Sequence, residues 1–153
     1  MGEAPLHLLK LCVGAESVDD LADWQQRYMR QQRAAGQTPR MRHVTRMWPR
    51  RAEEILSGGA LYWVIKGFIM VRQNILAFDE VRTEDGLRKC AIVLSPELIR
   101  TQNAPRRPFQ GWRYLQAQDA PPDLRIGDDQ SGGLPPRLEI ALAELGVGQG
   151  GRR

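Results

Sequence analysis

The arginines of this chain concentrate in one short stretch, RMRHVTRMWPRR, at residues 40–51. Five of these twelve residues are arginine, and no acidic residue interrupts them. Arginine presents a planar fork of N–H donors that suits phosphates and carboxylates, so the stretch predicts contact with an anion. Two plainer explanations stay open: an exposed basic face without a ligand, and a general enrichment of arginine in GC-rich genomes.

The end of this stretch carries a more specific pattern. Pro49 suits the first position of a short helix, and Arg50 and Arg51 would then occupy its first turn. The helix dipole disfavours cations there by a few tenths to roughly 1 kcal/mol, and Glu53 and Glu54 follow in the weaker orientation for helical ion pairs. A bound anion would supply the missing negative charge and would meet free backbone N–H groups. We therefore expect an anion at this helix start, although exposed arginines also tolerate so small a cost.

A second basic stretch, APRRPFQGWRY, covers residues 104–114 and alternates arginines with aromatic rings. Rings that stack on nucleic-acid bases contribute about 1–3 kcal/mol each, and arginine meets phosphates. If the fold brings both stretches together, they predict one nucleic-acid surface; otherwise the rings fill the core under a covering loop. The candidate binding residues are Arg42, His43, Arg46, Trp48, Arg50, Arg51, Arg106, Arg107, Trp112, Arg113 and Tyr114.

Few other residues suggest chemistry. His43 lies in an alternating stretch and could act as a general base only beside a nucleophile or an acid. Cys12 and Cys90 stand far apart in apolar contexts, which favours two buried, reduced thiols. The chain has no cluster with metal-ligand spacing and no phosphate-binding glycine loop, so we expect neither a metal nor a cofactor.

The most clearly marked element is a helix that begins after Ser17 and stops at Gly36. Ser17 is a capping residue, acidic side chains follow in the first turn, and arginines crowd the last turns, as the helix dipole favours. Apolar residues recur at spacings of three and four and predict one buried stripe: Val18, Leu21, Trp24 and Tyr28.

The remaining pattern consists mainly of strands. We expect strands at residues 6–14, 41–48, 60–66, 68–81 and 87–94, a helix at 50–57, a turn at 83–86, and a short strand or turn at 95–101. This order favours an α+β fold with a mixed sheet or a partly closed β-barrel and two or three flanking helices. The 153 residues fit one domain over residues 1–124, a linker over 125–136, and a short helix with a flexible tail over 137–153.

Composition narrows the class of protein further. The net charge is +4, and only Lys10, Lys66 and Lys89 of the 22 basic residues are lysines. The amino terminus, MGEAPLHLLKLCVGAE, has no basic start, and its apolar run is too short for a membrane helix. We therefore expect a cytoplasmic protein without a membrane partner.

Two resemblances add to this interpretation. The segments LHLLKLCVG, RHVTRMWPRRAEEILSGGALYWVIKG and RRPFQGWRYL resemble an uncharacterised family of alphaproteobacterial proteins, over most of the chain to about Leu124. This resemblance implies a bacterial cytosolic setting. The order MRHVTRMW, PRRAEEIL, SGG and ALYWVIKG is also similar to the PUA-like superfamily and its ASCH branch, which implies a small barrel and an RNA or nucleotide site.

Three functions are compatible with these patterns. The first is a non-catalytic module that binds RNA or another nucleic acid, with arginines on phosphates and with Trp112, Tyr114 and Trp48 on bases. The second is an enzyme acting on an anionic small molecule or nucleotide, with the arginines as a clamp and with His43 and Glu53 for acid–base chemistry. The third is an interaction module whose acidic protein partner meets the arginines.

Overall fold

The computed structural model describes residues 4–124 and 137–139. Its two α-helices are α1 (Val18–Ala34) and α2 (Ala52–Leu56), and η1 (Ala117–Asp119) is a short 3₁₀ helix. Its strands are β1 (His7–Leu11), β2 (Met41–Thr45), β3 (Ala60–Ile65), β4 (Phe68–Arg82), β5 (Arg88–Leu94), β6 (Glu97–Pro105), β7 (Trp112–Leu115) and β8 (Arg137–Glu139).

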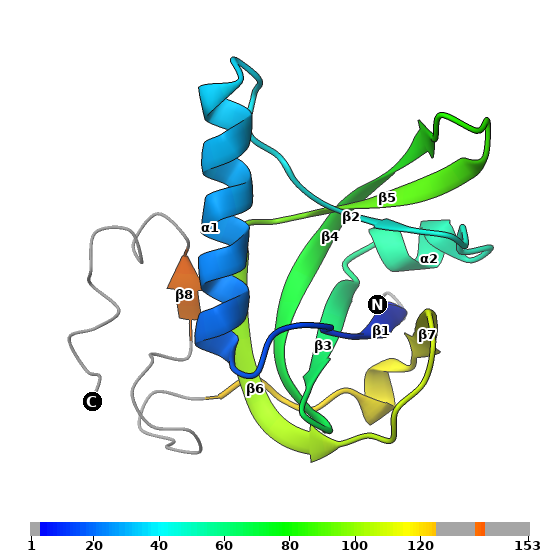
Figure 1. Ribbon diagram of the computed structural model, residues 1–153. Helices are drawn as coiled ribbons and strands as arrows, with labels where there is room; N and C mark the ends of the chain where they lie inside the picture. The colour runs from blue at the N-terminus through cyan, green and yellow to red at the C-terminus, as the bar shows by residue number, and fades with distance from the viewer. Residues whose placement is uncertain (1–3, 125–136, 140–153) are drawn as a thin grey trace.

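One mixed sheet organises the described residues, and helix α1 stands beside it (Figure 1). Hydrogen bonds join the strands in the order β2-β5-β4-β3-β1-β7, while β6 pairs with β4 and β8 pairs with β6. The pair β1–β3 is parallel, and the other pairs are antiparallel. The α+β class with a mixed sheet is thus confirmed. The sheet is not closed into a barrel, because no ladder of the described residues joins the outer strands β2 and β7.

Strand β3 forms the centre of the sheet. All six of its residues are buried, and it pairs with β1 on one edge and with β4 on the other. Lys66 and Gly67 turn the chain into β4 with φ angles of 51° and 85°, the two left-handed positions that a tight two-residue hairpin requires. An apolar run without alternation therefore marks a strand that is covered on both faces.

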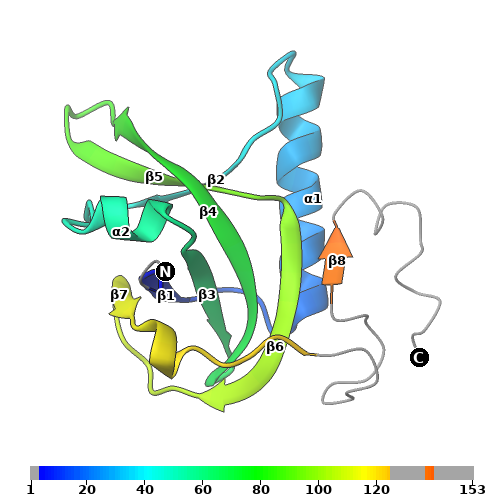
Figure 2. The same cartoon turned by 180° about the vertical axis from the view of Figure 1, so that it is seen from behind.

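The long strand β4 connects the two parts of the sheet. Its first half pairs with β3 on one edge and β6 on the other, and its second half pairs with β5. Strands β5 and β6 follow each other along the same edge, and β4 and β6 curve strongly (Figure 2). Register shifts between Trp63 and Val64 and between Ile75 and Ala77 mark irregular pairing in β4, which increases twist. This curvature carries β7 back toward the segment that follows β2.

Helix α1 begins where local chemistry predicts. The side chain of Ser17 accepts a hydrogen bond of 3.1 Å from the backbone N–H of Asp20. Its buried face, however, consists of Val18, Leu21, Ala22, Gln25 and Gln26. Trp24, expected in the apolar stripe, is 42 % exposed, because two glutamines occupy the inner face in its place.

The buried glutamine Gln25 is part of a polar network that fastens α1 to the sheet. Its amide exchanges two hydrogen bonds with Gln73 of β4, at 2.8 and 2.9 Å. The Oε1 of Gln73 also accepts from the indole N–H of Trp63 at 2.8 Å, and its amide donates to the carbonyl of Ser95 at 2.9 Å. Both glutamines are fully buried, so these bonds replace the water that the amides lose on folding.

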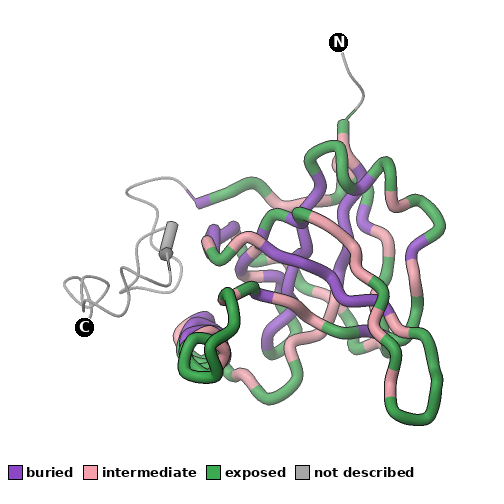
Figure 3. The backbone as a smooth tube through the Cα atoms, turned by 90° about the horizontal axis from the view of Figure 1, so that it is seen from above, coloured by how far each residue is buried: buried purple, intermediate pink, exposed green. Residues whose placement is uncertain are grey.

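The core lies along the inner face of the curved sheet, under α1 and α2, and Figure 3 shows buried backbone running through the central strands. A smaller cluster packs on the opposite face of the sheet around Tyr62, Ile69 and Leu115. None of the helices in the described ranges is both long and apolar enough to cross a membrane.

Several element boundaries differ from the expectation. Strand β2 ends at Thr45, and α2 begins only at Ala52, two residues later than the helix predicted after Pro49. Strand β6 extends to Pro105 and β7 lies in the stretch expected as a loop. Residues 137–139, expected to begin a helix, form β8 because they pair with the free edge of β6. The expected linker over 125–136 and the rest of the expected helix and tail lie outside the described residues.

Candidate functional site: a basic surface and an adjoining pocket

Two stretches that are remote in sequence meet near the start of α2. The Nε1–H of Trp112 donates a hydrogen bond of 2.9 Å to the carbonyl of Met47. The hydroxyl of Tyr114 accepts from the backbone N–H groups of Arg50, at 3.0 Å, and Arg51, at 3.3 Å. Trp112 and Tyr114 share one face of β7 and meet edge to face, with 5.0 Å between ring centroids. The rings of the second basic stretch therefore lie against the backbone of the first.

The helix start on which the expected anion depended is wrong. Because the helix begins at Ala52, the arginines precede it, and Glu53 and Glu54 occupy its first turn, where the dipole favours negative charge. The N–H groups of Arg50 and Arg51 already donate to Tyr114. The charge mismatch that suggested a ligand depended on a helix start two residues too early.

Three arginines remain available on this side of the molecule, and we call Arg42, Arg46 and Arg50 the basic surface. Arg46 and Arg50 are exposed, Arg42 is half-buried, and none of them forms an ion pair within the described residues. Arg51 differs, because its guanidinium bonds both oxygens of Glu54 at 2.7 and 2.8 Å and lies over the ring of Tyr114. Its charge is therefore already compensated.

The aromatic candidates make more internal contacts than the sequence suggests. Trp112 and Tyr114 are half-buried and pack against the main core, and both use their polar atoms in internal hydrogen bonds. Trp48 is also half-buried, with the guanidinium of Arg88 4.8 Å from its ring centroid and with Phe78 beside it. Internal contacts thus occupy much of the surface of these rings.

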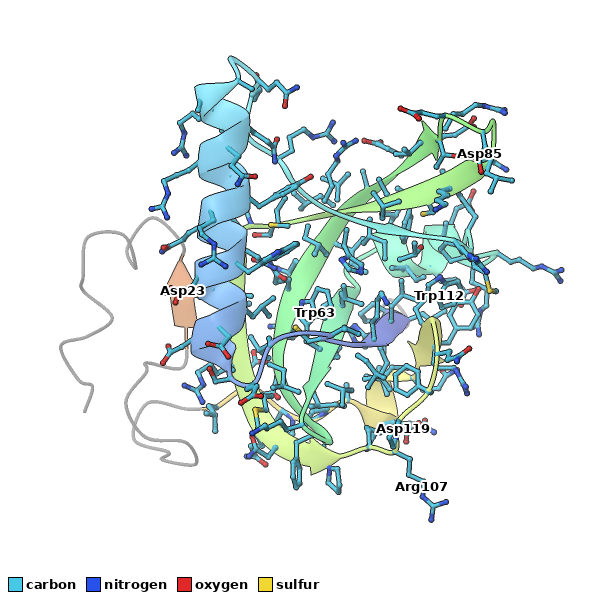
Figure 4. The ribbon with its side chains drawn as sticks, viewed as in Figure 1. Asp23, Trp63, Asp85, Arg107, Trp112 and Asp119 are labelled. Atoms are coloured by element: carbon cyan, nitrogen blue, oxygen red, sulfur yellow. The ribbon has the colours of Figure 1, made fainter. Side chains whose placement is uncertain are left out.

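The remaining arginine candidates lie elsewhere. Arg106 donates to the carbonyls of Pro105 and Asp119, and Arg107 projects from the lower edge of the molecule, below Asp119 and away from Trp112 (Figure 4). Arg113 alternates with Trp112 along β7, so it lies on the opposite face, with its guanidinium 5.3 Å from the ring centroid of Phe109. The fold therefore joins the second stretch to the basic surface through its rings and not through these arginines.

A pocket of about 800 Å³ opens next to β2, between the end of β1, helix α1 and β2. Trp63 of β3 is one of its lining residues. In Figure 4, Trp63 lies between Asp23 of helix α1 and Trp112 of β7. The polar lining of the pocket comes from three elements: Lys10 and Cys12 from β1 and its end, His43 from β2, and Asp20, Asp23 and Arg27 from α1. The pocket and the basic surface are close along the chain, because Arg42 precedes His43 and Val44, the two residues of β2 that line the pocket, and Arg46 follows two positions after Val44.

Burial changes the protonation of the groups inside this pocket. Burial, reinforced by the positive charge of Lys10, lowers the pKa of His43 to about 4, so its imidazole is neutral near pH 7. Its ring meets Trp63 edge to face, with 5.1 Å between centroids. Burial likewise lowers the pKa of Lys10. It raises the pKa of Cys12 to about 11, so this thiol is protonated and is a poor nucleophile.

Among the candidate binding residues, only His43 lines this pocket. The sequence predicts Lys10 in a strand, Trp24 in an apolar stripe, and Asp19 and Asp20 as negative charge in the first turn of a helix. Asp19 and Asp20 do lie in the first turn of α1, where Asp20 Oδ2 also accepts from the backbone N–H of Glu16 at 2.9 Å. A signal was available at Trp24, because the two glutamines that follow it, Gln25 and Gln26, share the buried face of α1 with Leu21 and Ala22.

Fold and site together define a small α+β protein with a curved mixed sheet, a basic strand at its edge and a polar, tryptophan-lined pocket beside that strand. The chain belongs to a family of proteins of unknown function, DUF1489, which matches residues 8–148. Searches among curated proteins and among solved structures found no significant match.

Proposed function

We propose that this protein binds single-stranded nucleic acid, RNA above all, without catalysing a reaction. The observation that carries the proposal is the contact of Trp112 with Met47, which joins the two basic stretches at one edge of the sheet. The basic surface beside this contact offers three guanidinium groups without an ion pair among the described residues. Guanidinium groups of this kind bind phosphates and place no demand on base sequence.

The test is a titration of a short single-stranded RNA by fluorescence anisotropy at several salt concentrations. Each phosphate contact contributes about 0.7 to the slope of log affinity against log salt for a single strand. Arg46→Ala and Arg50→Ala should each weaken binding and lower the slope by about that amount. Arg107→Ala is the matched control, because it removes the same charge at the lower edge of the molecule, away from Trp112. Absence of binding at low salt, or equal effects of Arg46→Ala and Arg107→Ala, would overturn the proposal.

The second candidate function is an enzyme that acts on a nucleotide or another anionic small molecule. The pocket supports it, since His43, Lys10 and Asp20 all line it. Glu53, the acid–base partner expected from the sequence, lies on α2 and does not line the pocket. Chromatography of nucleotides incubated with the protein tests this function, and turnover that His43→Gln abolishes would replace the binding proposal.

The resemblance to the PUA-like superfamily and the bacterial, cytoplasmic setting form part of the same proposal. The succession of β2, α2, a Gly58–Gly59 turn and β3 supports kinship with the PUA-like domains, in which the corresponding region is associated with RNA. Membership of a family of unknown function is compatible with the bacterial, cytoplasmic setting that we propose. A protein partner with an acidic surface would compete for the same arginines, so added RNA should displace it.

A further inference from the structure

Exposed apolar side chains gather at the mouth of the pocket. Val13 is 89 % exposed, Val44 is 44 % exposed and Trp24 is 42 % exposed, and all three line the same opening. They come from three segments that only the fold brings together: the β1–α1 connection, β2 and α1. Adjoining apolar exposure on a concave site is typical of a surface that a ligand covers.

Trp24 of α1 is one of the residues that line this pocket. Tyr28 stacks against Trp24 with 5.7 Å between centroids and 12° between ring planes, which holds the indole in place. No other ring packs on this indole among the residues that the structure describes. A fixed aromatic face of this kind favours a planar ligand that stacks on it.

The polar groups of the pocket balance in charge. Lys10 and Arg27 are cations, Asp20 and Asp23 are anions, and His43 is neutral. The pocket therefore exerts no net attraction on an anion. A neutral imidazole offers one donor and one acceptor, an ammonium group only donates, and a carboxylate only accepts. This set suits an uncharged ring whose edge carries both donors and acceptors.

We infer that the pocket binds a nucleobase, stacked against Trp24 with its polar edge toward Lys10 and His43. The volume of about 800 Å³ falls in the range of small-molecule sites and leaves room for a base with its sugar. The inference rests on the proposed function and deepens it, because the basic surface holds phosphates outside the pocket while one base enters it. The same ring chemistry can come from a strand or from a free nucleoside, and the experiment separates these sources.

The test compares a short RNA with a strand of equal length in which every nucleotide is abasic, at one low salt concentration. The intact strand should bind roughly 5- to 140-fold more tightly, the range expected for stacking of one base. Trp24→Ala should remove most of this difference and leave the affinity for the abasic strand unchanged. Trp24→Phe, which keeps a ring, should restore much of it. Because Trp24 is partly exposed on a helix, where alanine is favoured, the variant should remain folded.

Three outcomes distinguish the pocket from the basic surface. Equal affinities for both strands, unchanged by Trp24→Ala, would overturn the pocket and leave the proposed function standing. If neither strand binds, the proposed function fails. The pocket is then tested alone, by titrating the protein with each of the four free nucleosides at millimolar concentration and recording its tryptophan fluorescence. A fluorescence change that disappears in Trp24→Ala would uphold the pocket as a nucleoside site. No change with any nucleoside, together with no binding of either strand, would overturn it.

Discussion

The hydroxyl of Tyr114 lies 3.0 Å from the backbone nitrogen of Arg50 and accepts its N–H. The two residues are 64 positions apart, and a second bond of 3.3 Å reaches the N–H of Arg51. Helix α2 has only five residues and no side-chain cap of its own. One phenol from β7 thus orders the connection that leads into this helix and fixes the position of the basic surface.

Replacing this phenol should therefore loosen the segment. We expect Tyr114→Phe to lower the free energy of unfolding by about 1 kcal/mol, the usual net value of a hydrogen bond, as measured by urea denaturation. Tyr28→Phe is the matched control, since no hydrogen bond of its hydroxyl is present in the described part of the chain. If Tyr114→Phe and Tyr28→Phe lower the free energy of unfolding equally, the hydrogen bonds of the Tyr114 hydroxyl do not account for the loss.

The amide network under α1 gives a larger expected effect. Gln73→Met leaves the amide of Gln25 and the indole N–H of Trp63 without their buried partner, which should cost roughly 2–4 kcal/mol in urea denaturation. The double variant with Gln25→Met should cost less than the sum of the two single variants, because both polar groups of the pair are then gone. Gln110→Met on the exposed loop is the control, and it should change stability by under about 0.5 kcal/mol.

Gly59 should tolerate no side chain. A Cβ at this buried position would lie 2.1 Å from the carbonyl oxygen of Leu6 and 2.7 Å from that of Ile55, and backbone atoms cannot move aside cheaply. We expect Gly59→Ala to lower the free energy of unfolding by roughly 3 kcal/mol. Gly36→Ala is the comparison: it has a φ of 79° with open space around it, and should cost only about 1–2 kcal/mol. A smaller loss for Gly59→Ala than for Gly36→Ala would contradict the packing of β1 against this turn.

Stability should fall in mild acid. Burial lowers the pKa of His43 from its ordinary value of 6.5 to about 4 in the folded protein, so the unfolded chain takes up the proton first. The resulting stabilisation is complete above pH 6.5 and is lost as the pH falls toward 4; it amounts to at most ~3 kcal/mol. His7 acts in the same direction, since burial lowers its pKa and its Nδ1 accepts from the N–H of Ala60.

Urea denaturation at a series of pH values measures this effect. We expect His43→Gln to flatten the pH dependence between pH 6.5 and 4, with the residual slope coming from His7. An unchanged slope in the variant would show that His43 is accessible to protons in the folded state. Comparison with His7→Gln separates the two histidines, since only His43 lies in the pocket.

Local patterns predicted much of the fold. The cap at Ser17, the buried run of β3 and the turn between β4 and β5 were predictable, because each depends on residues a few positions apart. Boundaries that depend on distant partners were not. Strand β7 exists because Trp112–Leu115 pairs with β1, and residues 137–139 are extended because β6 offers them an edge. A proline- and glycine-rich stretch carries no local sign of such pairing.

The candidate site, too, has a part that the sequence predicts and a part that only the fold determines. The clustering of arginines around β2 is a property of the sequence, and so is the presence of rings near β7. The sequence does not determine whether these arginines and rings meet. The hydrogen bond from Trp112 to the carbonyl of Met47 brings the two stretches together. The structure also separated Arg106, Arg107 and Arg113 from this surface, because alternation along β7 and a tight loop send them to other faces.

The sequence by itself determined helix α1, the buried run of β3, the turn between β4 and β5 and the places where positive charge accumulates, since capping, spacing and composition act between near neighbours. Only the tertiary structure decided that Lys10, Trp24, His43 and Trp63 surround one pocket. These residues belong to four different elements, and no local pattern encodes their approach. Their shared environment, and with it the neutral state of His43, arises from the curvature of the sheet and the docking of α1, which are long-range packing effects.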